Sequence, residues 1–255
     1  MEKYVSFDGV SLAYKRWAGD AELPPVILLH RFGADSALTW IQAGVPGALT
    51  RAGRTVVAVD ARGHGGSEKP HDPARYGERT MARDVSALID DLQADAVDLV
   101  GYGMGAITAL LTAAADTRVR RLVAGGVGAG IVEVGGVDTR VWNRAARLEA
   151  LRAPDVGSIS DPEAREFRQY VDAVQADRLA LAAQVAAAHD DPIPLRRITA
   201  RTLVLAGSED RMAARPEVLV HAIPKAVGRF VAGDHVSTLG NPELPERIVE
   251  FLQAP

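Results

Sequence analysis

The chain has 255 residues, of which 47% are hydrophobic and 24% charged, so it can form a sizeable core and global disorder is excluded. Lys and Arg number 29 against 33 Asp and Glu, a formal net charge of −4 with no cysteine, which argues against a nucleic-acid partner and excludes disulfides, thiolate metal sites and cysteine nucleophiles. Residues 1–10 lack the apolar segment of a secretory signal, and no apolar run reaches the roughly 20 residues of a membrane-spanning helix, so we expect a cytoplasmic protein without a membrane partner.

Short apolar runs recur along the chain and predict strands. Residues 4–18 alternate between apolar and polar and are broken at Asp8-Gly9, which predicts a hairpin. The later runs do not alternate, a pattern typical of strands that are buried on both faces of a parallel sheet. These runs are residues 25–30, 54–60, 97–101, 121–124 and 201–206.

Helical patterns lie between these runs. Residues 80–95 carry apolar side chains along one face of a 3.6-residue repeat, and residues 104–115 are apolar nearly all round. Residues 242–252 close the chain with apolar side chains on one side. Strands that alternate with helices predict an α/β fold built on a mostly parallel, doubly wound sheet.

Residues 131–197 break this alternation. They contain no convincing buried strand, and their Arg- and Ala-rich helical stretches, including residues 161–188, are interrupted by Pro and Gly. We interpret this segment as a small helical cap inserted between two parts of one core, residues 1–130 and 198–255. The glycine-rich residues 125–130 lack the Lys-Ser/Thr pair of a phosphate-binding loop, so we interpret them as a flexible entrance to the cap.

The most informative segment joins the run at residues 97–101 to the helix at residues 104–115. Strand and helix meet through Gly101-Tyr-Gly-Met-Gly105, a tight turn in which the two outer glycines let strand and helix pass closely. Its tip, Gly103, precedes a helix at the carboxyl ends of the strands, where α/β sheets bind ligands.

This segment resembles the nucleophile elbow G-x-S-x-G of the α/β-hydrolase fold superfamily, which includes serine esterases, lipases and C–C hydrolases, with Gly103 in place of the serine. His30-Arg31-Phe32-Gly33 resembles the family's oxyanion loop, and residues 60–67 resemble its D-x-R-G-x-G-x-S loop. Asp210 and His235 follow in the family's order of nucleophile, acid and histidine. The resemblance covers essentially the whole chain and implies an α/β-hydrolase fold with a cap.

The resemblance also assigns roles to these residues. His235 would be the general base, and Asp210 would hold its tautomer and stabilise the imidazolium. The backbone N–H groups of Phe32 and Met104 would form the oxyanion hole. The family pattern calls for no metal and no cofactor.

We add His30, Arg31 and Tyr102 as candidate substrate-contacting residues beside these positions. Arg31 stands where the family pattern has a small residue, so we expect a rearranged loop with a cation near the mouth of the cleft. A solvated loop arginine is the alternative interpretation.

Gly103 has no hydroxyl group, so the route through an acyl-serine is closed. We therefore expect a small ester, thioester, lactone or ketone-type substrate, for which activity is either lost or carried by His235 and Asp210 without a covalent step. The alternatives are a lyase, isomerase or cyclase that uses the same pair, and a non-catalytic small-molecule-binding protein. Because Gly103 and Arg31 depart from the pattern together, they favour a natural change over an engineered knock-out. The sequence does not predict the oligomeric state.

Overall fold

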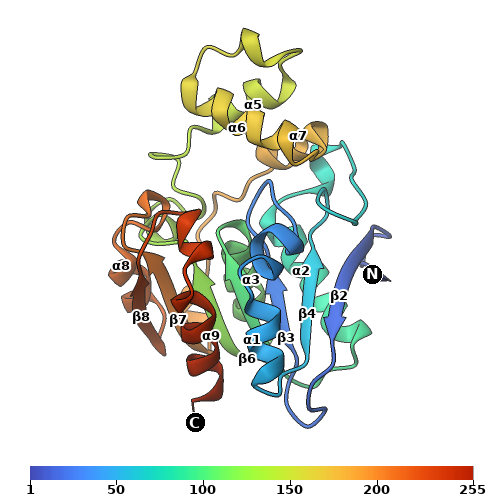
Figure 1. Ribbon diagram of the computed structural model, residues 1–255, viewed down its shortest axis with the longest axis vertical. Coiled ribbons are helices and arrows are strands. Elements are labelled where there is room, and N and C mark those ends of the chain that lie inside the picture. The colour runs from blue at the N-terminus through green and yellow to red at the C-terminus, as the bar shows by residue number, and fades with distance from the viewer. Residues whose placement is uncertain (255) are drawn as a thin grey trace.

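The computed structural model describes residues 1–254 of the chain. Its strands are β1 (Glu2–Val5), β2 (Ser11–Trp17), β3 (Val26–Leu29), β4 (Val56–Asp60), β5 (Val97–Tyr102), β6 (Val119–Gly125), β7 (Arg201–Gly207) and β8 (Ala226–Val231). Within this described part they form one eight-stranded sheet in the order β1-β2-β4-β3-β5-β6-β7-β8 (Figure 1). β1 and β2 form the predicted hairpin, β2 pairs antiparallel with β4, and all later pairs are parallel. The predicted mostly parallel α/β sheet is confirmed.

The central strands are buried on both faces. In β3, Ile27 and Leu29 belong to one hydrophobic cluster, whereas Val26 and Leu28 belong to a second cluster on the opposite face. All four side chains are at most 6% exposed. A strand that is covered on both faces needs no polar alternation, which explains why these runs are continuous in the sequence.

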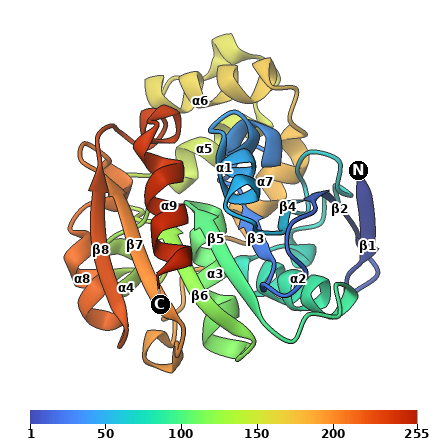
Figure 2. The same ribbon diagram turned by 60° about the horizontal axis from the view of Figure 1, so that its bottom comes forward.

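Helices supply the cover on each face of the sheet. The helices of the described chain are α1 (Val45–Arg51), α2 (Glu78–Asp91), α3 (Met104–Ala115), α4 (Gly130–Glu133), α5 (Arg144–Arg152), α6 (Pro162–Ala173), α7 (Arg178–Ala186), α8 (Pro216–Ala222) and α9 (Glu243–Gln253). Apolar side chains of α2, α3 and α8 join one cluster, and those of α1 and α9 join the other. The two groups therefore lie on opposite faces of the sheet (Figure 1; Figure 2).

Between β6 and β7 the described chain forms helices and loops but no strand. Helices α5, α6 and α7 pack together through Leu151, Val171 and Leu181 and lie beyond one end of the sheet, at the top of Figure 1. The predicted helical stretch at residues 161–188 is two helices, because the Asp177 side chain accepts hydrogen bonds from the N–H groups of Leu179 and Ala180 and starts α7 anew. The division into core and cap at residues 131 and 197 stays a prediction.

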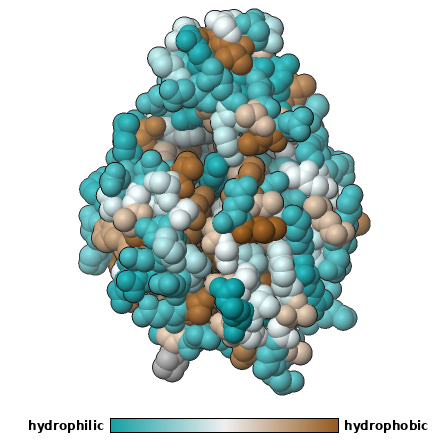
Figure 3. Space-filling view, viewed as in Figure 1, coloured by the Kyte–Doolittle hydropathy of each residue, from teal (hydrophilic) through white to brown (hydrophobic). Residues whose placement is uncertain are grey.

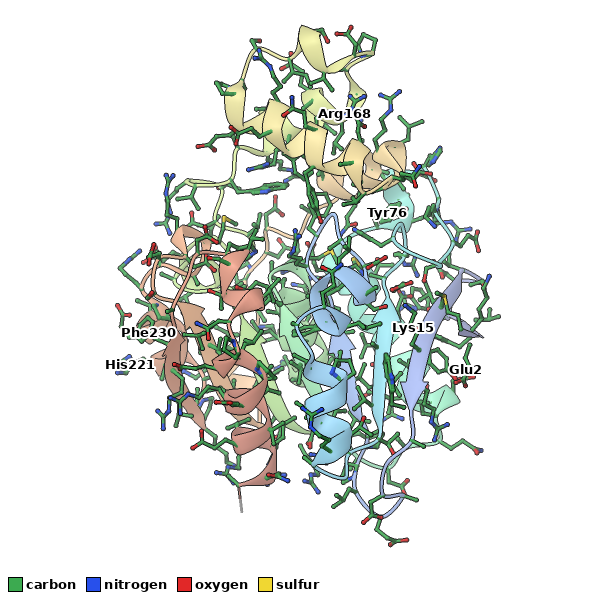
Figure 4. All side chains as sticks on the ribbon, in the orientation of Figure 1. Glu2, Lys15, Tyr76, Arg168, His221 and Phe230 are labelled. Carbon is green, nitrogen blue, oxygen red and sulfur yellow. The ribbon has the colours of Figure 1, made fainter. Side chains whose placement is uncertain are left out.

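Four of these elements were not predicted from the sequence: β8, α1, α4 and α8. α4 has only four residues, too few to show periodicity. β8 is an outer strand of the sheet, and its Val227 and Phe230 are 45% and 60% exposed (Figure 4). It therefore has no buried apolar run that would reveal it. The helices α1 and α8 have seven residues each and contain Pro46 and Pro216 in their first turn, and such short segments show little periodicity.

The strand order reverses beside β3. The chain passes from β3 to β4 on one side and returns to β5 on the other, so the loops after β3 and β5 diverge at the same edge of the sheet. Such a reversal opens a crevice at the carboxyl ends of the strands. On the face shown in Figure 3, the surface is mostly hydrophilic and is hollowed between the cap and the core. No helix among residues 1–254 is both long and apolar enough to span a membrane.

Candidate active site

The tip between β5 and α3 is held in an unusual backbone conformation. Gly103 has φ +55° and ψ −116°, in the region that side chains with a Cβ rarely adopt. A Cβ on Gly101 would overlap the backbone of Gly105, and a Cβ on Gly105 would overlap the backbone of Leu29. The two outer glycines therefore permit the close passage of strand and helix that the sequence predicts.

Asp210 and His235 come from the loops after β7 and β8. Oδ2 of Asp210 lies 2.9 Å from Nδ1 of His235, and the Asp210 side chain is fully buried. Its other oxygen, Oδ1, accepts hydrogen bonds from the N–H groups of Met212 and Ala213 at 2.8 and 3.3 Å. A carboxylate only accepts hydrogen bonds, so Nδ1 carries the proton and Nε2 is left as the basic nitrogen.

The basic nitrogen faces the glycine tip. A Cβ at position 103 would lie 3.2 Å from Nε2 of His235 and 3.5 Å from Cβ of Arg31. The His235 ring is backed by the Tyr102 ring, with 5.1 Å between the ring centroids. The structure thus brings together the three residues that the sequence assigns to the nucleophile, acid and base positions.

A cavity of about 270 Å³ opens in front of Gly103 and His235. On the core side it is lined by Arg31, Phe32 and Met104, among others. Phe32 belongs to the loop after β3, and Met104 is the first residue of α3, where the helix dipole favours negative charge. The use of their N–H groups as an oxyanion hole stays a prediction.

His30 and Tyr102 do not line this cavity, so the structure does not support their predicted contact with a substrate. The His30 ring is 1% exposed and has both nitrogens occupied, Nδ1 by the carbonyl oxygen of Arg31 and Nε2 by the N–H of Ala61. Its burial lowers the pKa of the His30 imidazole. Tyr102 is 1% exposed, and its ring supports His235 from behind.

Arg31 reaches from the core loop to the cap. Its Nη2 donates a hydrogen bond of 2.9 Å to the hydroxyl of Tyr170 on α6, and its guanidinium lies 5.1 Å from the Tyr170 ring centroid. Arg31 also lines the cavity. It is therefore neither a fully solvated loop residue nor a group remote from the tip.

The cap supplies cavity residues that the sequence analysis missed. They are chiefly Trp142, Arg147, Phe167 and Gln184. Phe32 of the core stacks on Phe167 at 5.8 Å and meets Trp142 edge-on at 5.9 Å. The spacing of Phe167 and Tyr170, three residues apart on one helix face, is the one signal in the sequence that points to this surface.

The glycine-rich loop at residues 125–130 also contributes, and its interpretation as a flexible entrance is wrong. The loop is buried throughout. Gly126, with φ +66°, lines the cavity, and a Cβ there would lie 2.9 Å from Cε1 of His235. Gly128 packs against the backbone of Ala213 and Ala214. These glycines allow the loop to pass closely behind the histidine. Among residues 1–254, no group of three or more His, Asp or Glu side chains is arranged to hold a metal ion.

The sequence of this chain is similar to those of known proteins. A family model described as alpha/beta hydrolase fold matches residues 24–131. An sn-1-specific diacylglycerol lipase of Mus musculus is 38% identical over 102 residues, which are 40% of this chain and 32% of the lipase. The chain spans about a third of the length of this and the next relatives that it matches.

Two further similarities extend over most of the chain. A 2-hydroxy-6-oxo-2,4-heptadienoate hydrolase of Pseudomonas putida is 29% identical over 211 residues, which are 72% of this chain and 75% of that protein. The crystal structure of a hydrolase from Pseudomonas aeruginosa superposes with a TM-score of 0.79 at 28% identity, covering 99% of this chain and 98% of that one.

Proposed function

Because this chain belongs to the α/β-hydrolase fold superfamily and has glycine at the tip of the elbow, we propose that His235 and Asp210 act on a small carbonyl substrate without a covalent step. The substrate class is an ester, thioester, lactone or ketone. One observation carries the proposal: Nδ1 of His235 is held 2.9 Å from Asp210, and Nε2 lies 3.2 Å from the point that a Cβ of residue 103 would occupy. The base therefore faces space that a serine side chain would otherwise fill.

In the hydrolytic version of this proposal, a water molecule is the nucleophile. Nε2 of His235 takes a proton from the water as its oxygen bonds to the carbonyl carbon, and the C=O π electrons move to the carbonyl oxygen. The N–H groups of Phe32 and Met104 hold that oxyanion. When the C=O re-forms, the leaving group departs and takes the proton back from Nε2. Asp210 stabilises the imidazolium between the two steps.

The relative from Pseudomonas putida supports the ketone branch, since its name describes the hydrolysis of a 6-oxo compound and the match covers 72% of this chain. For a ketone, the group that departs in the second step is a carbanion equivalent, and the proton from His235 goes to carbon. The same base and oxyanion site would equally serve proton removal beside a carbonyl group, the step that a lyase, isomerase or cyclase requires.

Substitution of the base tests the proposal. Assayed against a panel of small esters, thioesters, lactones and enolisable ketones, His235→Ala should lower kcat/KM by about 10²- to 10⁴-fold for any compound that the protein turns over, the usual size of a general-base contribution. Asp210→Asn should lower kcat more than it changes KM. His221→Ala, at an exposed histidine on α8, is the matched control.

Turnover that survives His235→Ala would contradict the proposed mechanism. If the wild-type protein binds compounds of the panel but converts none, the alternative of a non-catalytic small-molecule-binding protein replaces it.

A further inference from the structure

Two guanidinium groups line the cavity without a carboxylate partner. Arg31 and Arg147 both face it, and neither forms an ion pair with any residue among 1–254. Each also has a buried Nε that lacks a hydrogen-bond partner in this part of the chain. Charges that are partly removed from water are ordinarily paired, so two unpaired cations beside one cavity require an explanation.

Arg147 is held by aromatic rings rather than by acids. Its guanidinium carbon lies 5.3 Å from the Trp142 ring centroid and 4.9 Å from that of Phe167. Partial burial lowers the pKa of Arg147, and the charges of Glu163 and Asp161 oppose that shift only from a distance. The cation is therefore fixed in place but not neutralised.

The two acidic residues at the cavity do not supply a negative charge that pairs with Arg31 or Arg147. Both oxygens of Asp138 are bonded to Arg140, at 2.7 and 2.6 Å. Glu78 accepts a hydrogen bond from the N–H of His189, and its burial raises the pKa of its carboxyl group, which favours the neutral form. The cavity in front of His235 is thus left with an excess of positive charge.

Part of the wall of this cavity is aromatic. Phe32 contacts both Trp142 and Phe167, and the Arg147 guanidinium lies against the rings of Trp142 and Phe167. Flat apolar walls suit a planar ligand body, whereas a guanidinium group suits a carboxylate. A cavity of about 270 Å³ limits that ligand to a small molecule.

We propose that this site binds a small, planar carboxylic acid in its ionised form. Arg31 and Arg147 bind the carboxylate group, and the flat body of the ligand lies against Phe32, Trp142 and Phe167. The inference rests on the proposed function in one respect only, that the cavity in front of His235 is the substrate site. It adds that the carbonyl substrate carries a separate carboxylate group.

The test compares an acid with its neutral isostere, so that binding is measured apart from turnover. The probes are trans-cinnamate and trans-cinnamamide, which are planar, have the same shape and differ in charge. Titration calorimetry gives their Kd values. The acid should bind the wild-type protein about tenfold or more tightly than the amide, the discrimination expected of a charge-assisted hydrogen bond.

Substitutions show which residues cause the preference for the acid over the amide. Arg31→Gln and Arg147→Gln should each weaken binding of the acid by about tenfold and leave binding of the amide within about twofold. Arg152→Gln removes an exposed arginine from the same helix as Arg147 and should change neither Kd. His235→Gln should keep the preference for the acid, because it alters the base and not the cations.

The outcomes separate the two proposals. Equal Kd values for acid and amide, failure of the acid to bind, or a preference that survives the double variant Arg31→Gln/Arg147→Gln would overturn the anionic-substrate inference. The wild-type comparison decides the matter even where a variant does not fold. If the acid is preferred in both wild type and His235→Gln but His235→Ala does not impair turnover, then the catalytic proposal fails and the binding inference stands.

Discussion

At position 103 the backbone keeps the tight turn of the elbow, but the residue has no side-chain hydroxyl group. Its backbone, with φ +55° and ψ −116°, lies where a Cβ costs about 1–3 kcal/mol, and a glycine avoids that cost. A serine there would bring its Oγ within hydrogen-bond reach of Nε2 of His235, since its Cβ would lie 3.2 Å away. We expect Gly103→Ser to react covalently with a fluorophosphonate, which intact-protein mass spectrometry detects, because the paired histidine would activate the new hydroxyl.

Gly103→Ala is the control, because it introduces the same Cβ strain but no hydroxyl. It should lose a similar amount of stability and show no added mass. A folded Gly103→Ser protein that does not react would mean that His235 is not oriented toward the elbow as described. If that variant also gains ester hydrolysis, the surrounding site retains the ability to support serine chemistry.

His64 links the stability of the core loops to pH. It is 2% exposed, Nδ1 donates to the carbonyl of Arg62, and Nε2 accepts from the N–H of Gly33. Burial lowers the pKa of the His64 imidazole to about 3, against about 6.5 in the unfolded chain. The unfolded state therefore binds the proton first as the pH falls. The contribution of His64 is complete above pH 6.5 and is lost between 6.5 and 3, about 2 kcal/mol of it from pH 7.5 to 5.

Urea unfolding at pH 7.5, 6 and 5 measures this dependence. His64→Gln removes the titrating ring, so its free energy of unfolding should fall less than that of the wild-type protein between pH 7.5 and 5. His221→Gln, at an exposed site on α8 (Figure 4), should retain the wild-type slope. A slope in His64→Gln as steep as in the wild-type protein would refute the assignment.

At the scale of elements, the Arg168 side chain caps the C-terminus of α5 and joins α5 to α6. Arg168 of α6 is 5% exposed, its Nη1 donates to the carbonyl oxygens of Ala150 and Ala153, and its Nε donates to Asp172 (Figure 4). Carbonyls at a helix C-terminus have no partner within the helix. Arg168→Met keeps the stem but removes the donor to the Ala150 carbonyl, whereas the Ala153 carbonyl still accepts a hydrogen bond from Arg178. We therefore expect a loss of about 1–3 kcal/mol in the free energy of unfolding by urea.

Arg152→Met is the control for that change, since Arg152 is exposed at the end of α5. Hydrogen exchange should become faster in α5 and α6 of Arg168→Met, while the central strands stay protected. A stability loss no larger than that of Arg152→Met would show that the Ala150 carbonyl finds another partner.

Elements whose apolar residues meet the core could be predicted from the sequence, and those that meet water could not. β3 and α3 are continuous apolar segments because they are buried on every side. β8 exposes Val227 and Phe230 at the edge of the sheet, so its pattern carries no burial signal. The loop at residues 125–130 was misinterpreted because glycine permits close packing as well as flexibility, and composition does not distinguish the two.

At the scale of the whole molecule, one part of the candidate site could be predicted from the sequence and the other part could not. Gly103 and Asp210 each follow a predicted strand, whereas β8, the strand before His235, was not predicted. The meeting of the three residues at one edge of the sheet could be expected from the order of the motifs alone. The cap contacts could not be predicted, because the placement of Arg147 and Tyr170 depends on how three short helices dock above the sheet. The shape and charge of the cavity therefore depend on how the cap docks on the core, which the sequence patterns do not predict.

Of the polar contacts between the cap and the core, two lie at different places, and we expect them to contribute differently to stability. Arg31 donates to the Tyr170 hydroxyl at 2.9 Å beside the cavity, where both side chains are partly buried, whereas the contact between His71 and Asp177 joins side chains that are 51% and 30% exposed. Tyr170→Phe should lose about 1 kcal/mol of local stability and speed hydrogen exchange by about fivefold at the loop after β3 and in α6. His71→Ala should change exchange less than twofold, about what an exposed pair contributes. Deuterium uptake measured by mass spectrometry on both variants decides the point, and equal effects would mean that the cap is not anchored through the cavity.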